Sequence, residues 1–180
     1  NLHCLFCQNH EISRPGTSTI NISPALENVL DQVEKILNKG IHAVGFVSPS
    51  HVVPQVKAII RGLRSRGYNP ITVYNTNSYD KPETIDSLSG MIDVYLPDYK
   101  YVSQSISREF SDSSDYPAVA LKAIKRMYYQ KGSTLPLDGK GRAETYGAGT
   151  QSRVDVGTRT GVGTLRIHDD VPGDRGFHVS

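Results

Sequence analysis

Residues 43–76, AVGFVSPSHVVPQVKAIIRGLRSRGYNPITVYNT, decide the fold of this 180-residue chain. They begin with an apolar run at Ala43–Val47, which is typical of a strand. Apolar side chains then recur at helical spacing within Val52–Leu63, and Gly67 supplies the end of that helix. A second apolar run follows at Ile71–Tyr74. A strand, a helix and a strand in this order predict a βαβ unit with parallel strands.

The same alternation continues on both sides of this unit. Further helices are predicted where apolar residues recur at helical spacing, and one further strand where they run together. The polar residues 101–116 are predicted to form a loop. Because strands of a parallel sheet are buried on both faces, we expect an α/β fold whose sheet is covered on both faces. The additional elements are helices at 24–39, 82–88 and 117–127 and a strand at 93–96.

The composition of the chain changes near residue 132. Ten of the 16 glycines follow this point, and only 11 of the last 49 residues are large and apolar. Glycine loses more backbone entropy on folding than other residues, and few apolar side chains are present to offset that loss. We therefore predict a core at residues 1–131 and a poorly ordered tail, rich in Gly, Thr and Arg, at residues 132–180.

Charge and hydropathy exclude several classes of partner. The 20 Lys and Arg residues nearly balance the 18 Asp and Glu residues, so no basic surface favours nucleic acid. No apolar run approaches the roughly 18 residues that a membrane-spanning helix needs. The two cysteines, spaced for a metal or redox site, fit a reducing compartment. The predicted location is the cytoplasm, with no nucleic-acid or membrane partner.

Polar residues follow three successive strands of the predicted sheet. They occupy Ser48–His51, Asn75–Ser78 and Asp98–Lys100. Ligands of parallel sheets bind at the carboxyl ends of the strands, so these segments are predicted to form one polar rim. Simpler interpretations stay open at each segment: a helix cap or packing residue at His51, a turn at 75–78, and an ordinary ion pair between Asp98 and Lys100.

The only two cysteines, Cys4 and Cys7, form a C-x-x-C pair at the start of the sequence. Taken alone, this spacing suits a thiol redox couple, half of a zinc site or part of an iron–sulfur ligand set.

Together with the strand-end segments, Asn1–Asn9 resembles the radical S-adenosylmethionine family, and within it the subgroup related to pyruvate formate-lyase activating enzymes. The family signature, C-x-x-x-C-x-aromatic-C, is matched from its second position onward, and its first Cys is expected one position before Asn1. Val47–His51 matches V-(T/S)-P-(T/S)-H, Tyr74-Asn75 matches Y-N, and Asp93–Lys100 matches D-x-Y-L-P-D-(Y/F)-K. The resemblance runs from Asn1 to about Lys131.

The resemblance implies a partial (β/α) barrel of the radical S-adenosylmethionine type, incomplete at both ends. Cys4 and Cys7 would be metal ligands that help to hold a 4Fe–4S cluster, whose chemistry cleaves S-adenosylmethionine reductively to a 5′-deoxyadenosyl radical. The implied partners are a glycyl-radical enzyme or another protein substrate and an electron donor such as flavodoxin or ferredoxin. No catalytic side chain is assigned. The implied cofactor-binding residues are Phe6, Asn9, Ser48, Ser50, His51, Asn75, Thr76, Asp98 and Lys100.

Two alternatives of other classes accompany this expectation. The chain could be a non-catalytic fragment or metal-binding module, or a thiol–disulfide redox protein that uses Cys4 and Cys7. Within the resemblance, Asn75 stands where activating enzymes carry Asp, which implies a weaker cation site at that position.

Overall fold

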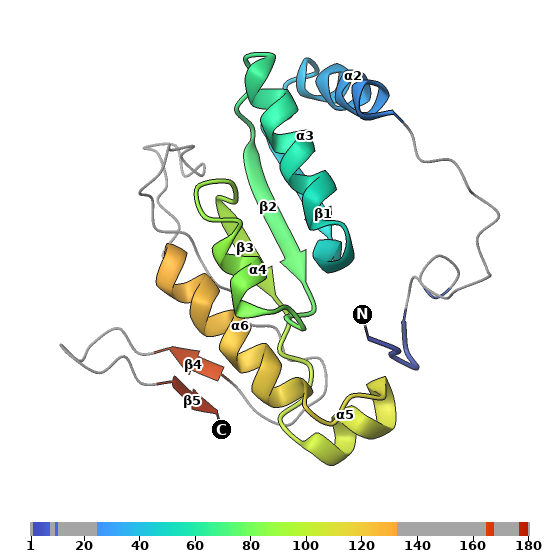
Figure 1. Cartoon of the computed structure of the whole chain (residues 1–180), viewed down its shortest axis with the longest axis vertical. Helices are drawn as coiled ribbons and strands as arrows, with labels where there is room; N and C mark the ends of the chain where they lie inside the picture. Colours follow the sequence, from blue (N-terminus) through green and yellow to red (C-terminus); the bar gives the residue numbers. More distant parts are fainter. Residues whose placement is uncertain (1, 8–9, 11–24, 133–164, 168–176, 180) are drawn as a thin grey trace.

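The computed structural model describes residues 2–7, 10, 25–132, 165–167 and 177–179 (Figure 1). Helices and strands alternate through residues 26–131, as the sequence predicts. The elements are α2 (Leu26–Leu37), β1 (Ala43–Val47), the 3₁₀ turn η1 (Pro49–His51), α3 (Val53–Ser65), β2 (Ile71–Thr76), α4 (Pro82–Asp86), β3 (Val94–Pro97), α5 (Gln104–Ser111), α6 (Tyr116–Lys131), β4 (Leu165–Ile167) and β5 (Phe177–Val179).

The first three strands form one parallel sheet in the order β1-β2-β3. Val47 pairs with Asn75 and Thr76 pairs with Pro97, so all three strands end at the same edge of the sheet. The predicted α/β class and the parallel pairing are confirmed. Strand β2 runs two residues further than predicted, to Thr76, so Asn75 and Thr76 belong to the strand and not to a turn.

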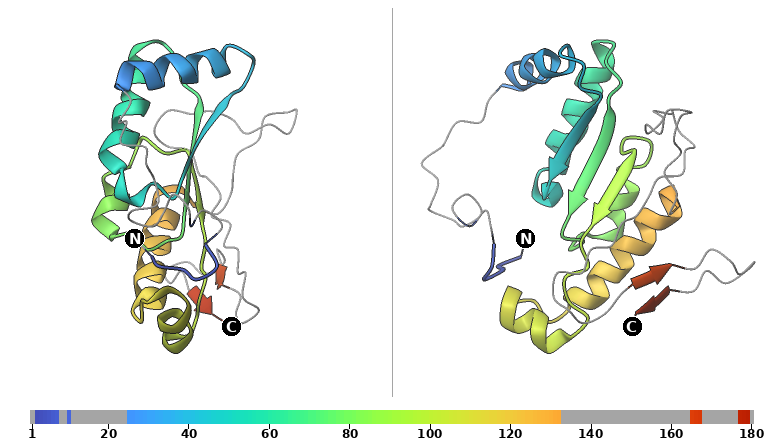
Figure 2. Two further views of the ribbon diagram at one scale, coloured as in Figure 1. Left: turned by 90° about the vertical axis from the view of Figure 1, so that its right-hand side faces the viewer. Right: turned by 180° about the vertical axis from the view of Figure 1, so that it is seen from behind.

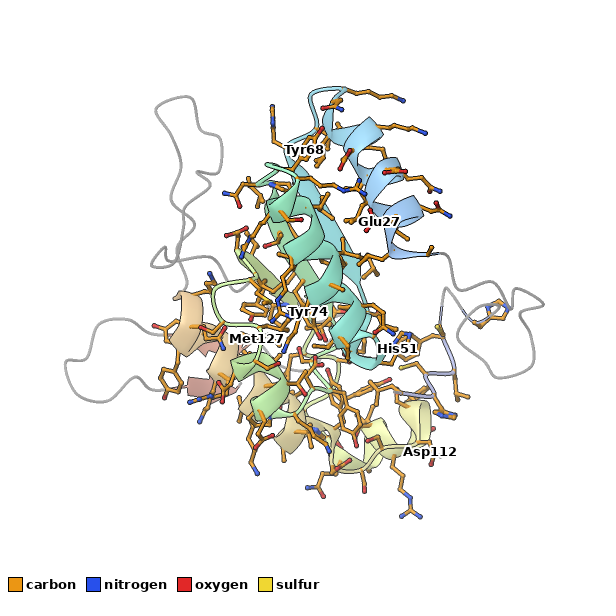
Figure 3. All side chains as sticks on the ribbon, turned by 45° about the horizontal axis from the view of Figure 1, so that its top comes forward. Glu27, His51, Tyr68, Tyr74, Asp112 and Met127 are labelled. Atoms are coloured by element: carbon orange, nitrogen blue, oxygen red, sulfur yellow. The ribbon has the colours of Figure 1, made fainter. Side chains whose placement is uncertain are left out.

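Helices α3, α4 and α6 cover one face of this sheet (Figure 2). Strand residues alternate between faces, and the buried positions of β2 are Thr72, Tyr74 and Thr76. In Figure 3, Tyr74 and Met127 lie in the interior that the sheet shares with these helices. Burying each large apolar side chain contributes roughly 1.5–3 kcal/mol. The core includes Val56, Ile60, Tyr74, Ile85, Leu88, Tyr95, Ile124 and Met127.

The face of β1 that points away from these helices is exposed, whereas the sequence predicts that it is buried. Ala43, Gly45 and Val47 are exposed, and Val47 retains 67% of its accessible surface. The expectation of burial on both faces is therefore wrong for β1 within the described part of the chain. Helices α3, α4 and α6 lie on the other face of the sheet, so among the described residues no element covers this face of β1.

Helix α2 packs on α3 through a close approach at Gly62. A Cβ atom at Gly62 would lie 2.6 Å from a methyl group of Leu30, so glycine at this position permits the contact. Arg66, which follows α3, adds ion pairs to α2: its guanidinium contacts Asp31 at 2.8 Å and Glu34 at 2.7 Å and also contacts Glu27. Figure 3 shows Glu27 on the helix above α3.

Helix α5 replaces the loop predicted at residues 101–116. Ser103 is its N-cap, with its side chain accepting the Ile106 N–H at 3.5 Å. The prediction of a loop was wrong because Ile106 and Phe110 are the only large apolar residues of this polar helix. Serine, which is neutral to unfavourable inside a helix, supplies three of its eight residues.

Most of the predicted tail lies outside the described residues. Within it, β4 and β5 pair antiparallel over three residues each. The boundary near residue 131 stays a prediction, while α6 itself ends at Lys131, followed by Gly132 with a φ of 72°. Within the part of the chain that the structure describes, no helix is long and apolar enough to cross a membrane.

Candidate functional site

Backbone hydrogen bonds join the carboxyl ends of the three parallel strands. The Ser48 N–H donates to the Asn75 carbonyl at 2.8 Å, and the Asp98 N–H donates to the Thr76 carbonyl at 2.8 Å. The predicted convergence of the three polar segments is confirmed. The side chains of the three segments differ in burial, however, and not all of them face solvent as a simple polar rim would require.

The Ser48–His51 segment makes a sharp turn between β1 and α3. Ser48 has a φ of 49°, in the left-handed region, and Pro49 then begins η1. The side chains of Ser48 and His51 are exposed, with His51 at the lower end of α3 in Figure 3. Ser50 Oγ is buried and has no hydrogen-bond partner among the described residues.

Asn75 and Thr76 lie on opposite faces of β2, because successive strand residues alternate. Asn75 is half-buried, whereas Thr76 is 1% exposed on the helix-covered face. The Thr76 hydroxyl donates to Asp80 Oδ2 at 2.6 Å and accepts the Ser78 N–H at 3.0 Å. Its hydroxyl therefore has a structural task, and only Asn75 of this pair presents a side chain toward the other face.

Asp80 is a site residue that sequence reasoning missed. Its carboxylate is 3% exposed and accepts hydrogen bonds from Thr76 and, at 3.2 Å, from the Tyr74 hydroxyl. Burial raises the pKa of Tyr74 well above its ordinary value, and the charge of Asp80 raises it further. Ser78 Oγ is also buried without a partner in the described residues. The only sequence signal was an acidic residue four positions after Thr76.

Asp98 and Lys100 form an ion pair, with Lys100 Nζ 2.6 Å from Asp98 Oδ2. The side chains retain 17% (Lys100) and 40% (Asp98) of their surface, so the pair is accessible to a ligand. The simpler interpretation of these two residues as an ion pair is confirmed. Their role in cofactor binding stays a prediction.

The Tyr116 hydroxyl ties the ends of β2 and β3 together. It lies 2.9 Å from the carbonyl oxygens of Asn77 and of Asp98, to either of which it can donate, and it accepts the Lys100 N–H at 2.8 Å. Tyr116 is completely buried, and this burial raises the pKa of its hydroxyl. Sequence reasoning missed it, because a tyrosine before a helix-opening proline carries no signal of a long-range contact.

Three other tyrosines surround the Tyr116 ring, and we call the four the tyrosine cluster. Tyr79 stacks on it with ring centres 6.0 Å apart, and Tyr101 meets it edge to face at 5.3 Å. Tyr99 lies 6.2 Å away. Aromatic pairs at these separations stabilise one relative orientation of the rings, so the cluster fixes the position of Tyr116 at the strand ends.

The cysteine turn, residues 2–7, rests on α5 and on the tyrosine cluster. The Cys7 N–H donates to the Cys4 carbonyl at 3.3 Å, which brings the two half-buried side chains, not joined by a disulfide, onto one turn. Cys4 Sγ accepts a hydrogen bond from Ser111 at 2.9 Å, and the Phe6 ring meets Tyr101 edge to face at 6.3 Å. Leu2 packs against the core. Asn9 lies outside the described residues.

The donor set of the cysteine turn fits part of an iron–sulfur site. Two thiols on one turn are soft ligands of the kind that clusters need. Among the described residues, no group of three or more His, Cys, Asp and Glu side chains could hold a metal ion. The cluster, its third ligand and the cofactor stay predictions.

Comparison with known proteins adds one relative. No family model and no solved structure matches the chain. The chain is similar to the uncharacterized protein MJ0674 of Methanocaldococcus jannaschii, with 26% identity over 122 residues. The match covers 64% of this chain and 35% of the relative, so the chain spans about a third of the length of the curated protein it matches.

Proposed function

We propose that this chain belongs to a radical S-adenosylmethionine enzyme related to the activating enzymes of glycyl-radical proteins. The observation that carries the proposal is the position of the cysteine turn. Cys4 contacts Ser111, Ser111 contacts Tyr101, and Tyr101 packs on the Tyr116 ring whose hydroxyl holds the ends of β2 and β3. Cofactors of parallel α/β folds bind at the carboxyl ends of the strands, and these contacts connect the thiol pair to those ends.

Each part of the site has a task in this proposal. Cys4 and Cys7 would hold a 4Fe–4S cluster together with a third thiolate, expected one position before Asn1. When bound, that cluster supplies the electron that cleaves S-adenosylmethionine reductively to a 5′-deoxyadenosyl radical. Phe6, 46% exposed, packs edge to face on Tyr101 and would present an apolar surface beside the cofactor. The sheet would be the first part of a partial (β/α) barrel.

The strand ends supply groups for the methionyl end of the cofactor. Asn75 and Lys100 can donate hydrogen bonds to a carboxylate, and Asp98 can accept from an amino group. Ser48 and His51, both exposed in the segment that follows β1, are the next donors available. Thr76 would act indirectly, by holding Asp80 and by fixing Asp98 through its carbonyl oxygen.

The partners follow from the same proposal. A glycyl-radical enzyme or another protein substrate would enter over the strand ends, and a flavodoxin or ferredoxin would deliver the electron. Neither partner has a contact surface defined by the described residues, so the cofactor chemistry is the part to test first.

Anaerobic reconstitution with iron and sulfide tests the proposal. We expect about four irons per chain in a version with one cysteine placed directly before Asn1, a characteristic electron-paramagnetic-resonance signal after reduction, and 5′-deoxyadenosine from S-adenosylmethionine. Cys4→Ser and Cys7→Ser should each abolish the signal. His3→Ala, a change at an exposed residue of the same turn, is the matched control and should keep it.

Two other results would identify the alternatives. One zinc per chain, with no bound iron after reconstitution, indicates a metal-binding module. A reversible two-electron disulfide between Cys4 and Cys7, with no S-adenosylmethionine cleavage, indicates a thiol–disulfide protein. Either result contradicts the radical mechanism.

A further inference from the structure

We propose that Ser111, oriented by Tyr101, positions the sulfur of Cys4 and shifts the reduction potential of the metal centre that Cys4 would hold. The redox consequence rests on the proposed function, whereas the positioning rests on contacts of the chain without metal. Ser111 is a positioning residue in this proposal, because it acts through Cys4.

The hydrogen bonds around Ser111 run in one direction. Ser111 is 1% exposed, and its hydroxyl donates to Cys4 Sγ at 2.9 Å. A serine hydroxyl has one proton, so while Ser111 donates to Cys4, the contact of 2.6 Å between Ser111 Oγ and the Tyr101 hydroxyl uses the Tyr101 proton. Tyr101, 3% exposed, therefore donates to Ser111, which donates to Cys4. Successive bonds in one direction polarise and strengthen one another.

The end of α5 also holds the backbone of the cysteine turn. The Leu5 N–H donates to the Phe110 carbonyl at 2.9 Å, and the His3 N–H donates to the Ser111 carbonyl at 3.4 Å. The last carbonyl groups of a helix have no partner within the helix, so α5 ends with acceptors available for another segment. Side-chain and backbone contacts thus fix the sulfur of Cys4 from the same turn of α5.

A donor aimed at a ligand sulfur has a predictable redox effect. Reduction adds negative charge to an iron–sulfur cluster and its thiolates, and a hydrogen bond to sulfur stabilises that charge. Ser111 should therefore favour the reduced state of the centre. Net hydrogen-bond contributions of about 1 kcal/mol correspond to about a fivefold change in the ratio of reduced to oxidised centre at fixed potential.

Helix α5 offers a closely matched control for this inference. Ser107 lies one turn before Ser111, is also fully buried, and donates to the Gln104 carbonyl of its own helix at 3.2 Å. We would compare Ser111→Ala, Ser107→Ala and Ser111→Thr, which keeps the hydroxyl. Tyr101→Phe removes the orienting group but leaves Ser111 able to donate, so its effect should be the smaller one.

The first measurement uses the full chain without metal. Amide hydrogen exchange at Leu5 should be about fivefold faster in Ser111→Ala, unchanged in Ser107→Ala and restored in Ser111→Thr. The second measurement is a redox titration of the reconstituted chain by electron paramagnetic resonance. Ser111→Ala should shift the midpoint potential to more negative values, and Ser107→Ala should not.

The two measurements separate failure of this inference from failure of the proposed function. Identical Leu5 exchange in Ser111→Ala and Ser107→Ala overturns the positioning role. A centre that assembles with the same midpoint potential in both variants overturns the redox role. If the version with a cysteine directly before Asn1 binds no iron, the proposed function fails, and the exchange result alone decides the positioning role.

Discussion

Strands β2 and β3 carry a buried polar group at each end, and the two ends are built differently. At the amino end, the Thr72 hydroxyl lies 2.8 Å from Asp93 Oδ2 and accepts the Asp93 N–H at 3.0 Å. At the carboxyl end, the Thr76 hydroxyl donates to Asp80 and accepts the Ser78 N–H. The two threonines carry the same side chain and lie on the same face of β2, so the comparison isolates the effect of their surroundings.

The difference lies in what surrounds each pair. At the amino end the partners are the strands themselves and the adjoining loop, including the Met91 carbonyl at 2.6 Å from the Thr72 hydroxyl. At the carboxyl end, partners come from loops and α6, and the buried hydroxyls of Ser50 and Ser78 lack partners among the described residues. The polar groups at the amino end thus stabilise the fold. At the carboxyl end, hydroxyl groups remain that could form hydrogen bonds with a bound ligand.

The largest effect should come from the hydroxyl that organises the carboxyl end. Tyr116→Phe leaves the partly buried Lys100 N–H and two carbonyl groups without their shared partner, so we expect a loss of about 2–3 kcal/mol in the free energy of unfolding. Tyr99→Phe is the matched control, since the Tyr99 hydroxyl makes one bond of 3.4 Å. Urea unfolding measures both, and equal losses would contradict the special role of Tyr116.

The matched threonines give the sharpest comparison of the two ends. Thr72→Val and Thr76→Val each remove a hydroxyl that lies within hydrogen-bond distance of an aspartate and accepts a backbone N–H, so each should cost about 1–3 kcal/mol of stability. Only Thr76→Val should weaken S-adenosylmethionine binding, by about tenfold, because it supports the carboxyl end. Calorimetric titration of the reconstituted chain decides this. Equal affinities in both variants would remove the functional distinction.

The Asp98–Lys100 pair should matter more for ligand binding than for stability. Lys100→Met removes a partly exposed ion pair, for which we expect a change in the free energy of unfolding below about 1 kcal/mol. The pair should also weaken as salt is added. Chemical unfolding at low and high salt measures this. A loss several times larger would show that the pair is structural and would argue against an accessible ligand site.

The smallest effects should appear as pH dependences of the two ends in different pH ranges, and at both ends stability should rise with pH. At the carboxyl end, hydrogen bonds from Tyr79 and Ser113 hold the pKa of Asp115 below its ordinary value. Its stabilisation is therefore present above about pH 4 and is lost as the pH falls through the lower folded pKa. At the amino end, burial lowers the pKa of Lys131. Because the unfolded chain then binds more protons, stability should rise with pH up to about 10.4.

Single substitutions separate these two contributions. Asp115→Asn should flatten part of the acid limb of a stability–pH profile, and Lys131→Gln should flatten the alkaline rise. Urea midpoints between about pH 3 and pH 10 report both. An alkaline rise that persists in Lys131→Gln would assign it to another group.

Much of the fold was predictable because its signals are local. The strand at Ala43–Val47 is confirmed residue for residue, and α3 and β2 agree within two residues at each end except for the separate turn η1. Apolar runs and helical spacing involve neighbours in sequence, so they can be recognised without knowledge of the tertiary contacts. The polar helix α5 was missed because Ile106 and Phe110 give too few apolar positions to define a helical period.

The candidate site was predictable only where chain direction fixes position. Parallel strands must end at one edge, so the meeting of Ser48, Asn75 and Asp98 followed from the order of elements. Asp80, Tyr116 and Ser111 were missed because their roles depend on which side chain meets which across the fold. The contact between Ser111 and Cys4 joins residues 107 positions apart.

By itself, the sequence determined the parallel α/β sheet, the edge where its polar residues gather and the spacing of the two cysteines, because each depends on local periodicity or chain order. Only the tertiary structure decided how deeply these residues lie and what holds them. Burial places Thr76 against Asp80, and contacts through Ser111, Tyr101 and Tyr116 link Cys4 to the strand ends. Such contacts depend on packing between distant segments, which no local pattern specifies.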